Sequence, residues 1–179
     1  DIRSNGIATA NNSRSTGSIP FMKVVDSQML AFNQGITRRG SYAAYMDIDH
    51  PEIEEFINIR KESGGDINRK CLNLHNGINL TNEFLQAVKN DDDWRLIDPK
   101  TKEAVKIVSA RELWWQILNA RAETGEPYMV NIDNCNDALP KPQKDLGLEI
   151  KQSNLCSEIT LPTNEERTAV CCLSSVNLE

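Results

Sequence analysis

The hydrophobic positions of this chain fall into short blocks whose spacing switches repeatedly between that of helices and that of strands. Apolar residues three or four apart indicate helices over residues 20–35, 49–64, 81–88 and 109–125. Alternating apolar and polar residues indicate strands over 41–48, 71–80 and 128–132, and a β-hairpin over 94–97 and 104–108. Two further strand candidates follow at 148–161 and 169–178.

Polar residues mark the starts of several of these helices. Asp49 with Glu52, and Ser109 with Glu112, have the spacing of a capping box, in which a side chain at the helix start and another three residues later satisfy free backbone N–H groups. Thr81 is a suitable N-cap for the helix that follows it. We therefore expect helices to begin at these three places.

The order of elements favours an α/β fold. Strands that alternate with helices form parallel sheets or barrels, because each helix carries the chain back across the sheet. The first nineteen residues are rich in Asn, Ser, Thr and Gly, which favours turns. Loops are short and the chain has no internal repeat, so we expect a single domain segment over residues 1–179.

Composition excludes some classes of function. The 179 residues are 39% hydrophobic and 26% charged, with a net charge of −6, which is typical of a globular protein and argues against a nucleic-acid partner. No apolar run approaches the ~20 residues of a membrane span, and no secretion leader opens the chain. We expect neither a membrane partner nor secretion.

The cysteines point to a reducing compartment. There are five, an odd number, and no pair has the Cys-x-x-Cys spacing of a zinc or thioredoxin-type site. We therefore expect a cytoplasmic protein. Cys71 and Cys135 are expected to be structural.

The stretch from Gln152 to Ile159 is the most informative for chemistry. In extended backbone, Asn154, Cys156 and Glu158 would project to the same side, about 6–7 Å apart. One small substrate could then meet a thiol for nucleophilic or one-electron chemistry, a carboxylate to accept a proton and an amide to orient it. The simpler alternative is a buried cysteine flanked by ordinary polar residues.

A second thiol site is formed by adjacent cysteines. Cys171 and Cys172 would point to opposite faces of a strand, so a disulfide between them is not expected. Either one of them shares an interior with Cys156, or both simply pack. No metal site is expected, because the cysteines and histidines lack ligand spacing.

Phosphate-binding motifs are absent, but loop arginines are present. Neither a P-loop nor a Gly-x-Gly-x-x-Gly pattern occurs. Arg3, Arg14, Arg38 and Arg39 lie beside loop residues and could bind a phosphate, although solvated loop arginines are commoner.

Several motifs, taken in order, match one family over essentially the whole chain. They are Thr16-Gly17-Ser18-Ile19-Pro20, Gln34-Gly35 with Arg39-Gly40, Thr124-Gly125 with Tyr128, Asn131 and Asp133 leading to Cys135-Asn136, Asn154-Leu155-Cys156 with Glu158, and Ala169-Val170-Cys171. The chain resembles the central part of the catalytic large (alpha) subunit of ribonucleotide reductase, closest to class I. The resemblance implies a ten-stranded α/β barrel, of which this chain supplies a part, with flanking parts missing.

The resemblance also implies roles. Cys156 would become a thiyl radical that removes the ribose 3′ hydrogen, Glu158 would accept the 3′-hydroxyl proton, and Asn154 would hydrogen-bond the substrate. Cys171 matches one half of the redox pair that supplies electrons. The implied activity is that of a ribonucleoside-diphosphate reductase, which makes deoxyribonucleotides for DNA synthesis.

Effectors and partners follow from the same resemblance. Arg3 matches a residue that binds the phosphates of a deoxynucleotide effector, and residues 64–71 match a loop that relays effector identity, with Asn68 and Arg69 as its contacts. No cofactor is expected to bind the chain directly. The radical would come from a metal-containing small subunit, ATP or deoxynucleotides would act as effectors, the full large subunit would form a homodimer, and thioredoxin or glutaredoxin would be the reductant.

Two readings of the chain remain open. It is either a segment that is catalytic only together with the rest of its subunit, or a non-catalytic fragment that keeps the fold and could retain effector binding or dimer contacts.

Overall fold

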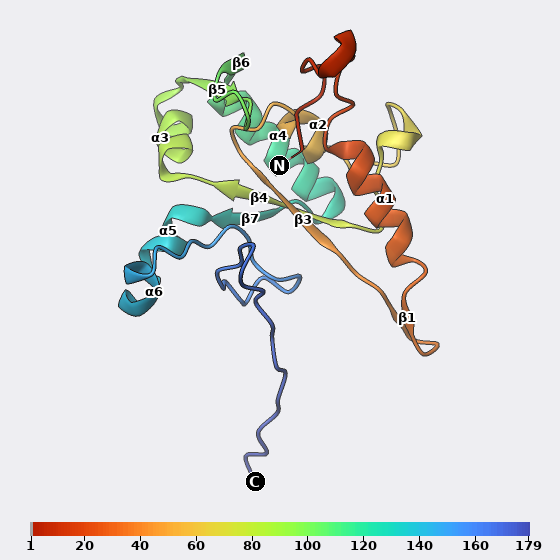
Figure 1. The fold of residues 1–179 in the computed structure, drawn as a ribbon, viewed down its shortest axis with the longest axis vertical. Coiled ribbons are helices and arrows are strands. Elements are labelled where there is room, and N and C mark those ends of the chain that lie inside the picture. The colour runs from red at the N-terminus through yellow and green to blue at the C-terminus, as the bar shows by residue number, and fades with distance from the viewer. Residues whose placement is uncertain (1) are drawn as a thin grey trace.

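A three-stranded parallel sheet forms the centre of the molecule (Figure 1). The computed structural model describes residues 2–179, apart from the side chain of Gln34. Strand β4 (His75–Leu80) lies between β3 (Ala43–Asp47) and β7 (Tyr128–Asn131), and both pairings are parallel. The α/β class and the parallel strands are therefore confirmed. Over the part of the chain that is described, the sheet stays open and does not close into a barrel.

Helices α1 (Ile19–Met29), α2 (Ile53–Ile57) and α4 (Ala110–Thr124) lie on one side of this sheet (Figure 1). The predicted hairpin is present as an antiparallel pair. The other elements are η1 (Ala10–Asn12), β1 (Asn33–Gln34), β2 (Arg38–Arg39), η2 (Ile67–Arg69), α3 (Asn82–Asn90), β5 (Asp93–Ile97), β6 (Ala104–Ser109), α5 (Ile132–Asp137) and α6 (Lys141–Asp145). No helix among residues 2–179 is long and apolar enough to cross a membrane.

Two of the predicted helix starts are confirmed in detail. The Thr81 hydroxyl accepts a hydrogen bond from the Phe84 N–H at 3.1 Å, and the Ser109 hydroxyl accepts one from the Glu112 N–H at 3.2 Å. Helix α4 ends at Gly125, whose φ of 81° lies in the left-handed region that a residue without Cβ adopts freely.

The capping box predicted at Asp49 is wrong. Helix α2 begins at Ile53, and Asp49 lies in the turn before it, where burial and the nearby charge of Asp47 raise its pKa. The physical reason is that Glu52 does not reach back to Asp49. Its carboxylate instead accepts hydrogen bonds from the N–H and the hydroxyl of Ser18, at 2.9 and 3.0 Å.

Glu52 therefore joins the start of α1 to the start of α2. It is buried, and Arg69 approaches it at 3.6 Å. Gly17 is required beside it, because a Cβ at that position would lie 2.0 Å from a carboxylate oxygen of Glu52. Helix α1 ends at Met29 rather than near Gly35, because the following residues form the small β1–β2 hairpin.

The core lies between the sheet and α2 and α4. Phe56, Ile78, Leu113 and Ile117 are fully buried there, and each such side chain contributes about 1.5–3 kcal/mol to stability. At one end of the core, the rings of Phe84 and Trp94 pack edge to face, with centroids 5.2 Å apart.

The opposite face of the sheet, which we call the open face, carries a different set of side chains. Because paired residues in parallel strands project to the same side, Tyr45, Gly77 and Tyr128 form one row across it. His75 and Asn79 project to the same side from the neighbouring rows. The Tyr45 ring lies over Gly77, where a Cβ would come within 2.3 Å of it.

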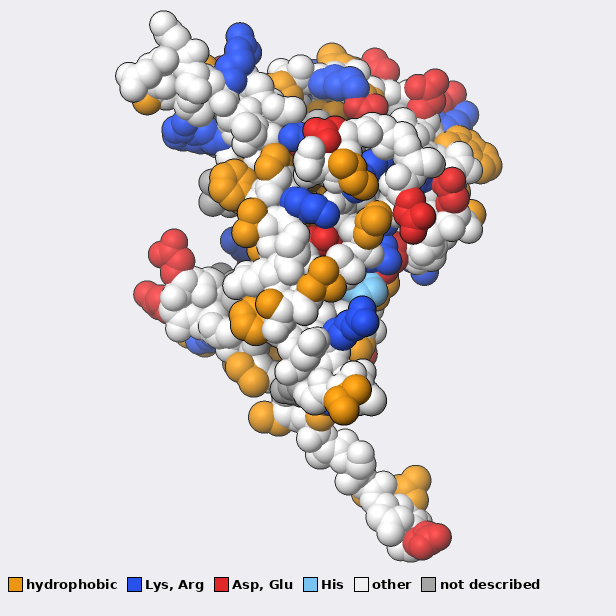
Figure 2. Space-filling view, turned by 90° about the vertical axis from the view of Figure 1, so that its right-hand side faces the viewer, with side chains coloured by type: hydrophobic (Ala, Val, Ile, Leu, Met, Phe, Trp, Pro, Cys, Tyr) orange, Lys and Arg blue, Asp and Glu red, His pale blue; other side chains and the backbone are white. Residues whose placement is uncertain are grey.

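The strands predicted at 148–161 and 169–178 are wrong. Residues 150–179 contain only an isolated bridge between Asn164 and Arg167, and the segment runs beneath the open face before its tail leaves the body of the molecule (Figures 1 and 2). A strand forms only where a neighbouring strand accepts its backbone hydrogen bonds. No strand of the described sheets pairs with this segment, so its alternating sequence has no such neighbour.

Candidate active site

The Cys156 loop, which we define as residues 154–159, is closed by one asparagine. The backbone of Asn154 exchanges hydrogen bonds with its partners on the far side of the loop: its N–H donates to the Ile159 carbonyl and its carbonyl accepts from the Ser157 N–H, at 3.0 and 3.1 Å. Its side-chain oxygen also accepts from the Ile159 N–H at 3.0 Å. Asn154 thus has a structural role, whatever its Nδ2 group binds.

The expectation of extended backbone around Cys156 is wrong. Cys156 lies in a turn, and Ser157 has a φ of 66°, in the left-handed region. The side chains of Asn154, Cys156 and Glu158 therefore share a short loop but not one face of a strand. Cys156 and Glu158 are both exposed, so the alternative of a buried, packed Cys156 is also wrong.

Polar contacts hold the loop against the open face. The Tyr45 hydroxyl lies 2.5 Å from the Ser153 hydroxyl, and Asn79 donates to the Lys151 carbonyl at 2.8 Å. Asn136, in α5, accepts from the Ile150 N–H at 2.8 Å and donates to its carbonyl at 2.9 Å. These contacts fix where the Cys156 loop begins.

Two phenols, Tyr45 and Tyr128, lie in the row of the open face whose Tyr45 contacts Ser153 at the start of the loop. Burial raises the pKa of Tyr128, and the charges of Glu126, Tyr45 and Cys156 raise it further. Sequence analysis did not assign a role to either tyrosine. Tyr45 could be identified because Gly77, which has no side chain, lies opposite it. This pairing is known only when the register of β3 and β4 is known.

Cys171 shares a hollow with the loop. Asn154 and Cys171 both line a space of about 130 Å³ beneath the sheet, together with Ile159, Leu161 and Val170. Cys172 does not line this hollow. Cys171 and Cys172 are both exposed and free, in agreement with the expectation that they form no disulfide with each other.

The other two cysteines differ from these three. Cys71 is fully buried, and its pKa is raised to about 12, by burial and then by the charge of Asp26. Cys135 is half-buried in α5. Among residues 2–179, no three His, Cys, Asp or Glu side chains are grouped so that they could hold a metal ion.

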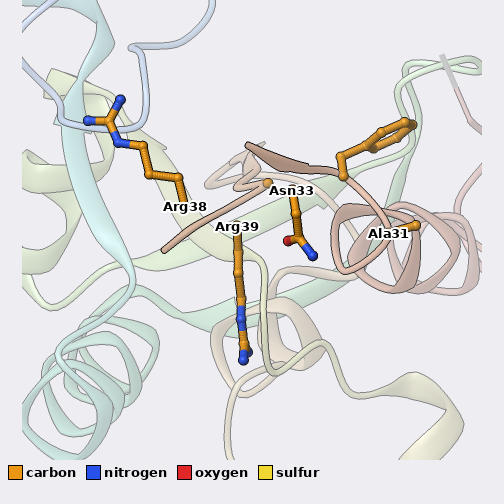
Figure 3. A pocket seen from close by; sticks show the side chains of 6 residues that line it. Ala31, Asn33, Arg38 and Arg39 are labelled. Atoms are coloured by element: carbon orange, nitrogen blue, oxygen red, sulfur yellow. The ribbon is translucent and has the colours of Figure 1, made fainter. Parts of the chain in front are cut away.

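A second candidate site lies on the β1–β2 hairpin. A hollow of about 580 Å³ is lined by Ala31, Phe32, Asn33, Arg38, Arg39 and Gly40. Figure 3 shows the side chains of Arg38 and Arg39 leaving the hairpin in different directions, with Asn33 beside Arg39. Two arginines line this hollow, so it is a candidate site for an anionic ligand.

The residues predicted to contact an effector are placed as follows. Arg3 lies beside the loop of residues 4–16, where its carbonyl accepts from the Ser15 hydroxyl at 3.0 Å. Arg69 binds Glu55 through two nitrogens and donates to the Thr16 carbonyl at 3.1 Å, which brings this loop and residues 64–71 together. The Asn68 side chain donates to Asp66 at 3.0 Å.

Comparison with known proteins identifies relatives along the whole chain. The family model described as "Ribonucleotide reductase, barrel domain" matches residues 1–179. A putative ribonucleoside-diphosphate reductase large subunit of Frog virus 3 is 54% identical over 168 residues, which cover 94% of this chain and 30% of the relative. The large subunit of Arabidopsis thaliana is 33% identical over 99% of this chain and 24% of its own length.

A solved structure agrees with these relatives. The class Id ribonucleotide reductase alpha subunit of Actinobacillus ureae superposes with a TM-score of 0.74 at 31% identity, over 96% of this chain and 28% of that chain. The chain thus spans about a third or less of the length of the proteins that it matches.

Proposed function

The chain belongs to the ribonucleotide reductase family, as a segment of the barrel domain of the large subunit, and from this premise we propose that it carries the catalytic loop for the reduction of ribonucleotides to deoxyribonucleotides. The substrate proposed is a ribonucleoside diphosphate, after the activity in the names of the relatives. The observation that carries the proposal is the Cys156 loop: an exposed thiol and an exposed carboxylate on one tight loop, over a sheet face lined with phenols.

In the proposed reaction, a thiyl radical at Cys156 takes the hydrogen atom from C3′ of the ribose. Glu158 accepts the proton of the 3′-hydroxyl, and Asn154 orients the sugar through its Nδ2 group. The 2′-hydroxyl then leaves as water, and the hydrogen atom returns from Cys156 to C3′, which regenerates the thiyl radical. Holding the groups on one short loop lowers the entropic cost of bringing them to the same sugar.

Two electrons are needed for each turnover. We propose that Cys171 and a second cysteine outside residues 1–179 supply them together with two protons: one leaves with the 2′-hydroxyl as water, the other adds as hydrogen at C2′, and the two thiols are oxidised to a disulfide. Cys171 suits this role because it lines the same hollow as Asn154. Thioredoxin or glutaredoxin would reduce the disulfide afterwards.

The remaining partners are proposed on the basis of the family. A metal-containing small subunit supplies the oxidising equivalent that generates the radical, and the full large subunit acts as a homodimer. A reducing compartment such as the cytoplasm suits the five free thiols.

The decisive experiment is Cys156→Ser in the full-length large subunit, assayed with its small subunit for deoxynucleotide formation. We expect turnover to be lost and the circular dichroism spectrum to be unchanged, because the loop is exposed and contributes little to the core. Cys135→Ser is the matched control and should retain turnover. Substantial turnover by the Cys156→Ser protein would refute the radical assignment.

A second candidate function is nucleotide binding without catalysis, and the Arg38–Arg39 hollow favours it. Here Arg38 and Arg39 would bind the phosphates of a nucleotide, in addition to the contacts predicted for Arg3, Asn68 and Arg69. The test is equilibrium binding of a deoxynucleoside triphosphate to the full-length subunit. Arg38→Ala with Arg39→Ala should weaken binding at least tenfold, whereas Lys141→Ala, an exposed cation on α6, should not change it.

A further inference from the structure

A buried carboxylate beside the open face fixes the orientation of a histidine. Glu126 precedes β7, and its side chain accepts a hydrogen bond from the Asn76 N–H at 3.0 Å and lies 3.3 Å from Nε of Arg60. Its other oxygen is hydrogen-bonded to Nδ1 of His75. An ionised carboxylate only accepts hydrogen bonds, so Nδ1 carries the hydrogen and donates it. This bond sets both the tautomer and the plane of the imidazole.

The oriented imidazole stacks on a tyrosine of the neighbouring strand. The rings of His75 and Tyr128 have centroids 6.1 Å apart and planes that differ by 14°. His75 begins β4 and Tyr128 begins β7, so the stack bridges the two strands on the open face. Part of the His75 side chain, 30%, is exposed, so the ring is not simply core packing.

Tyr128 lies in the row of the sheet that meets the Cys156 loop. Tyr45 is in the same row, and its hydroxyl contacts Ser153, two residues before the loop turns. The His75–Tyr128 stack is thus part of the sheet face against which the start of the Cys156 loop is held.

From these contacts we propose that His75, oriented by Glu126, is a positioning residue that fixes the Tyr128 ring in the row of the open face that meets the Cys156 loop. The proposal rests on the proposed function, because it concerns the surroundings of the reactive thiol. His75 does not contact the substrate in this scheme. It acts through Tyr128, by fixing where the phenol lies on the sheet face that meets the Cys156 loop.

The first test reads the ring position without turnover. The full-length large subunit is prepared with 3-fluorotyrosine at position 128, and its ¹⁹F NMR signal is recorded. We expect His75→Ala to shift and broaden the signal, because the stacked ring is lost. His75→Asn keeps a donor for Glu126 but removes the ring, so it should remain folded and show the same shift.

The control is His50→Ala, since His50 follows the far end of β3 and should leave the signal unchanged. A signal that is identical in the His75→Asn protein and the unmodified protein would overturn the proposal, whether or not the His75→Ala protein folds.

The second test separates positioning from substrate binding. In the holoenzyme, His75→Asn should lower kcat about ten- to a hundredfold at unchanged KM, the size of effect expected from a small displacement of a catalytic group. An unchanged kcat would overturn the proposal, and so would a change in KM alone. If Cys156→Ser retains turnover, the proposed function fails instead, while the ¹⁹F result remains a valid measurement of the stack.

Discussion

The body of the molecule, residues 43–137, and the C-terminal segment, residues 150–179, are held in place by different forces. In the body, the side chains of Phe56, Ile78 and Ile117 are fully buried. In the segment, Val170 and Leu173 are 72% and 85% exposed. The residues with proposed catalytic roles lie in the second region, where a few polar contacts replace the hydrophobic core. Substitutions in the first region should therefore change the free energy of unfolding. Substitutions in the second should mainly change the position of the Cys156 loop.

The largest expected difference is in the free energy of unfolding, when one apolar residue from each region is replaced by alanine. Phe56→Ala removes a fully buried ring and should lower the free energy of unfolding by about 3–5 kcal/mol. Leu173→Ala, in the exposed tail, should change it by less than about 0.5 kcal/mol. Urea unfolding followed by tryptophan fluorescence measures both, and similar losses for the two variants would contradict the comparison.

Gly77→Ala tests the contact at which the regions meet. The new Cβ would lie 2.3 Å from the Tyr45 ring, so the ring must move, at a cost of about 1–3 kcal/mol. Since Tyr45 also contacts Ser153, we expect faster hydrogen exchange over residues 150–160. In a Tyr45→Ala background the same glycine substitution should cost little, and a full cost there would show that another contact is responsible.

Asn136→Ala should act on the segment more than on the body. It removes both hydrogen bonds to Ile150, so exchange at residues 150–160 should rise while α4 stays protected. The free energy of unfolding should fall by only about 1 kcal/mol. Gln86→Ala, which removes an exposed side-chain bond within α3, is the control. Equal deprotection of α4 would mean that Asn136 supports the whole fold.

The smallest effect concerns the reactivity of thiols. At pH 8 an alkylating reagent should modify Cys156, Cys171 and Cys172 quickly and leave Cys71 unmodified until the chain unfolds. Burial raises the pKa of Cys71 to about 12, so the stability that its protonated form contributes is present below about pH 8.5 and is lost as the pH rises toward 12. Mass spectrometry of the labelled peptides gives the order of modification, and early labelling of Cys71 would contradict its burial.

Helix starts could be predicted from the sequence where the interactions that determine them are between residues close in the chain. Thr81 and Ser109 start helices because their hydroxyls bond to backbone three residues away, and this depends on nothing else in the fold. The capping box predicted at Asp49 fails because of a residue that is distant in sequence. Its capping partner Glu52 is bound by Ser18, which is 34 residues distant, and only the tertiary structure reveals that competition.

The roles of the site residues stay predictions, and the shape of the site could not be predicted. Their spacing indicated that Asn154, Cys156 and Glu158 share one face of a strand, but the segment is a loop closed by Asn154 itself. Alternating polarity over 148–161 resembles a strand whether or not another strand is available to pair with it. Tyr45 and Tyr128, which form the row of the sheet that meets the start of the loop, come from strands far away in sequence, and this row can be identified only when the register of the strands is known.

The carboxylate of Glu52 at the start of α1 has a consequence for ligand competition. The first turn of a helix attracts anions, and here a carboxylate of the chain itself already occupies that place, with Ser18 and Arg69 around it. Glu52 behaves as a tethered ligand, present at an effective concentration on the order of millimolar or more. A free phosphate at lower concentration would be outcompeted at this end of α1. The hollow at the β1–β2 hairpin, lined by Arg38 and Arg39, has no such internal competitor among the hydrogen bonds and ion pairs of the described residues, so an added anion should bind there in preference.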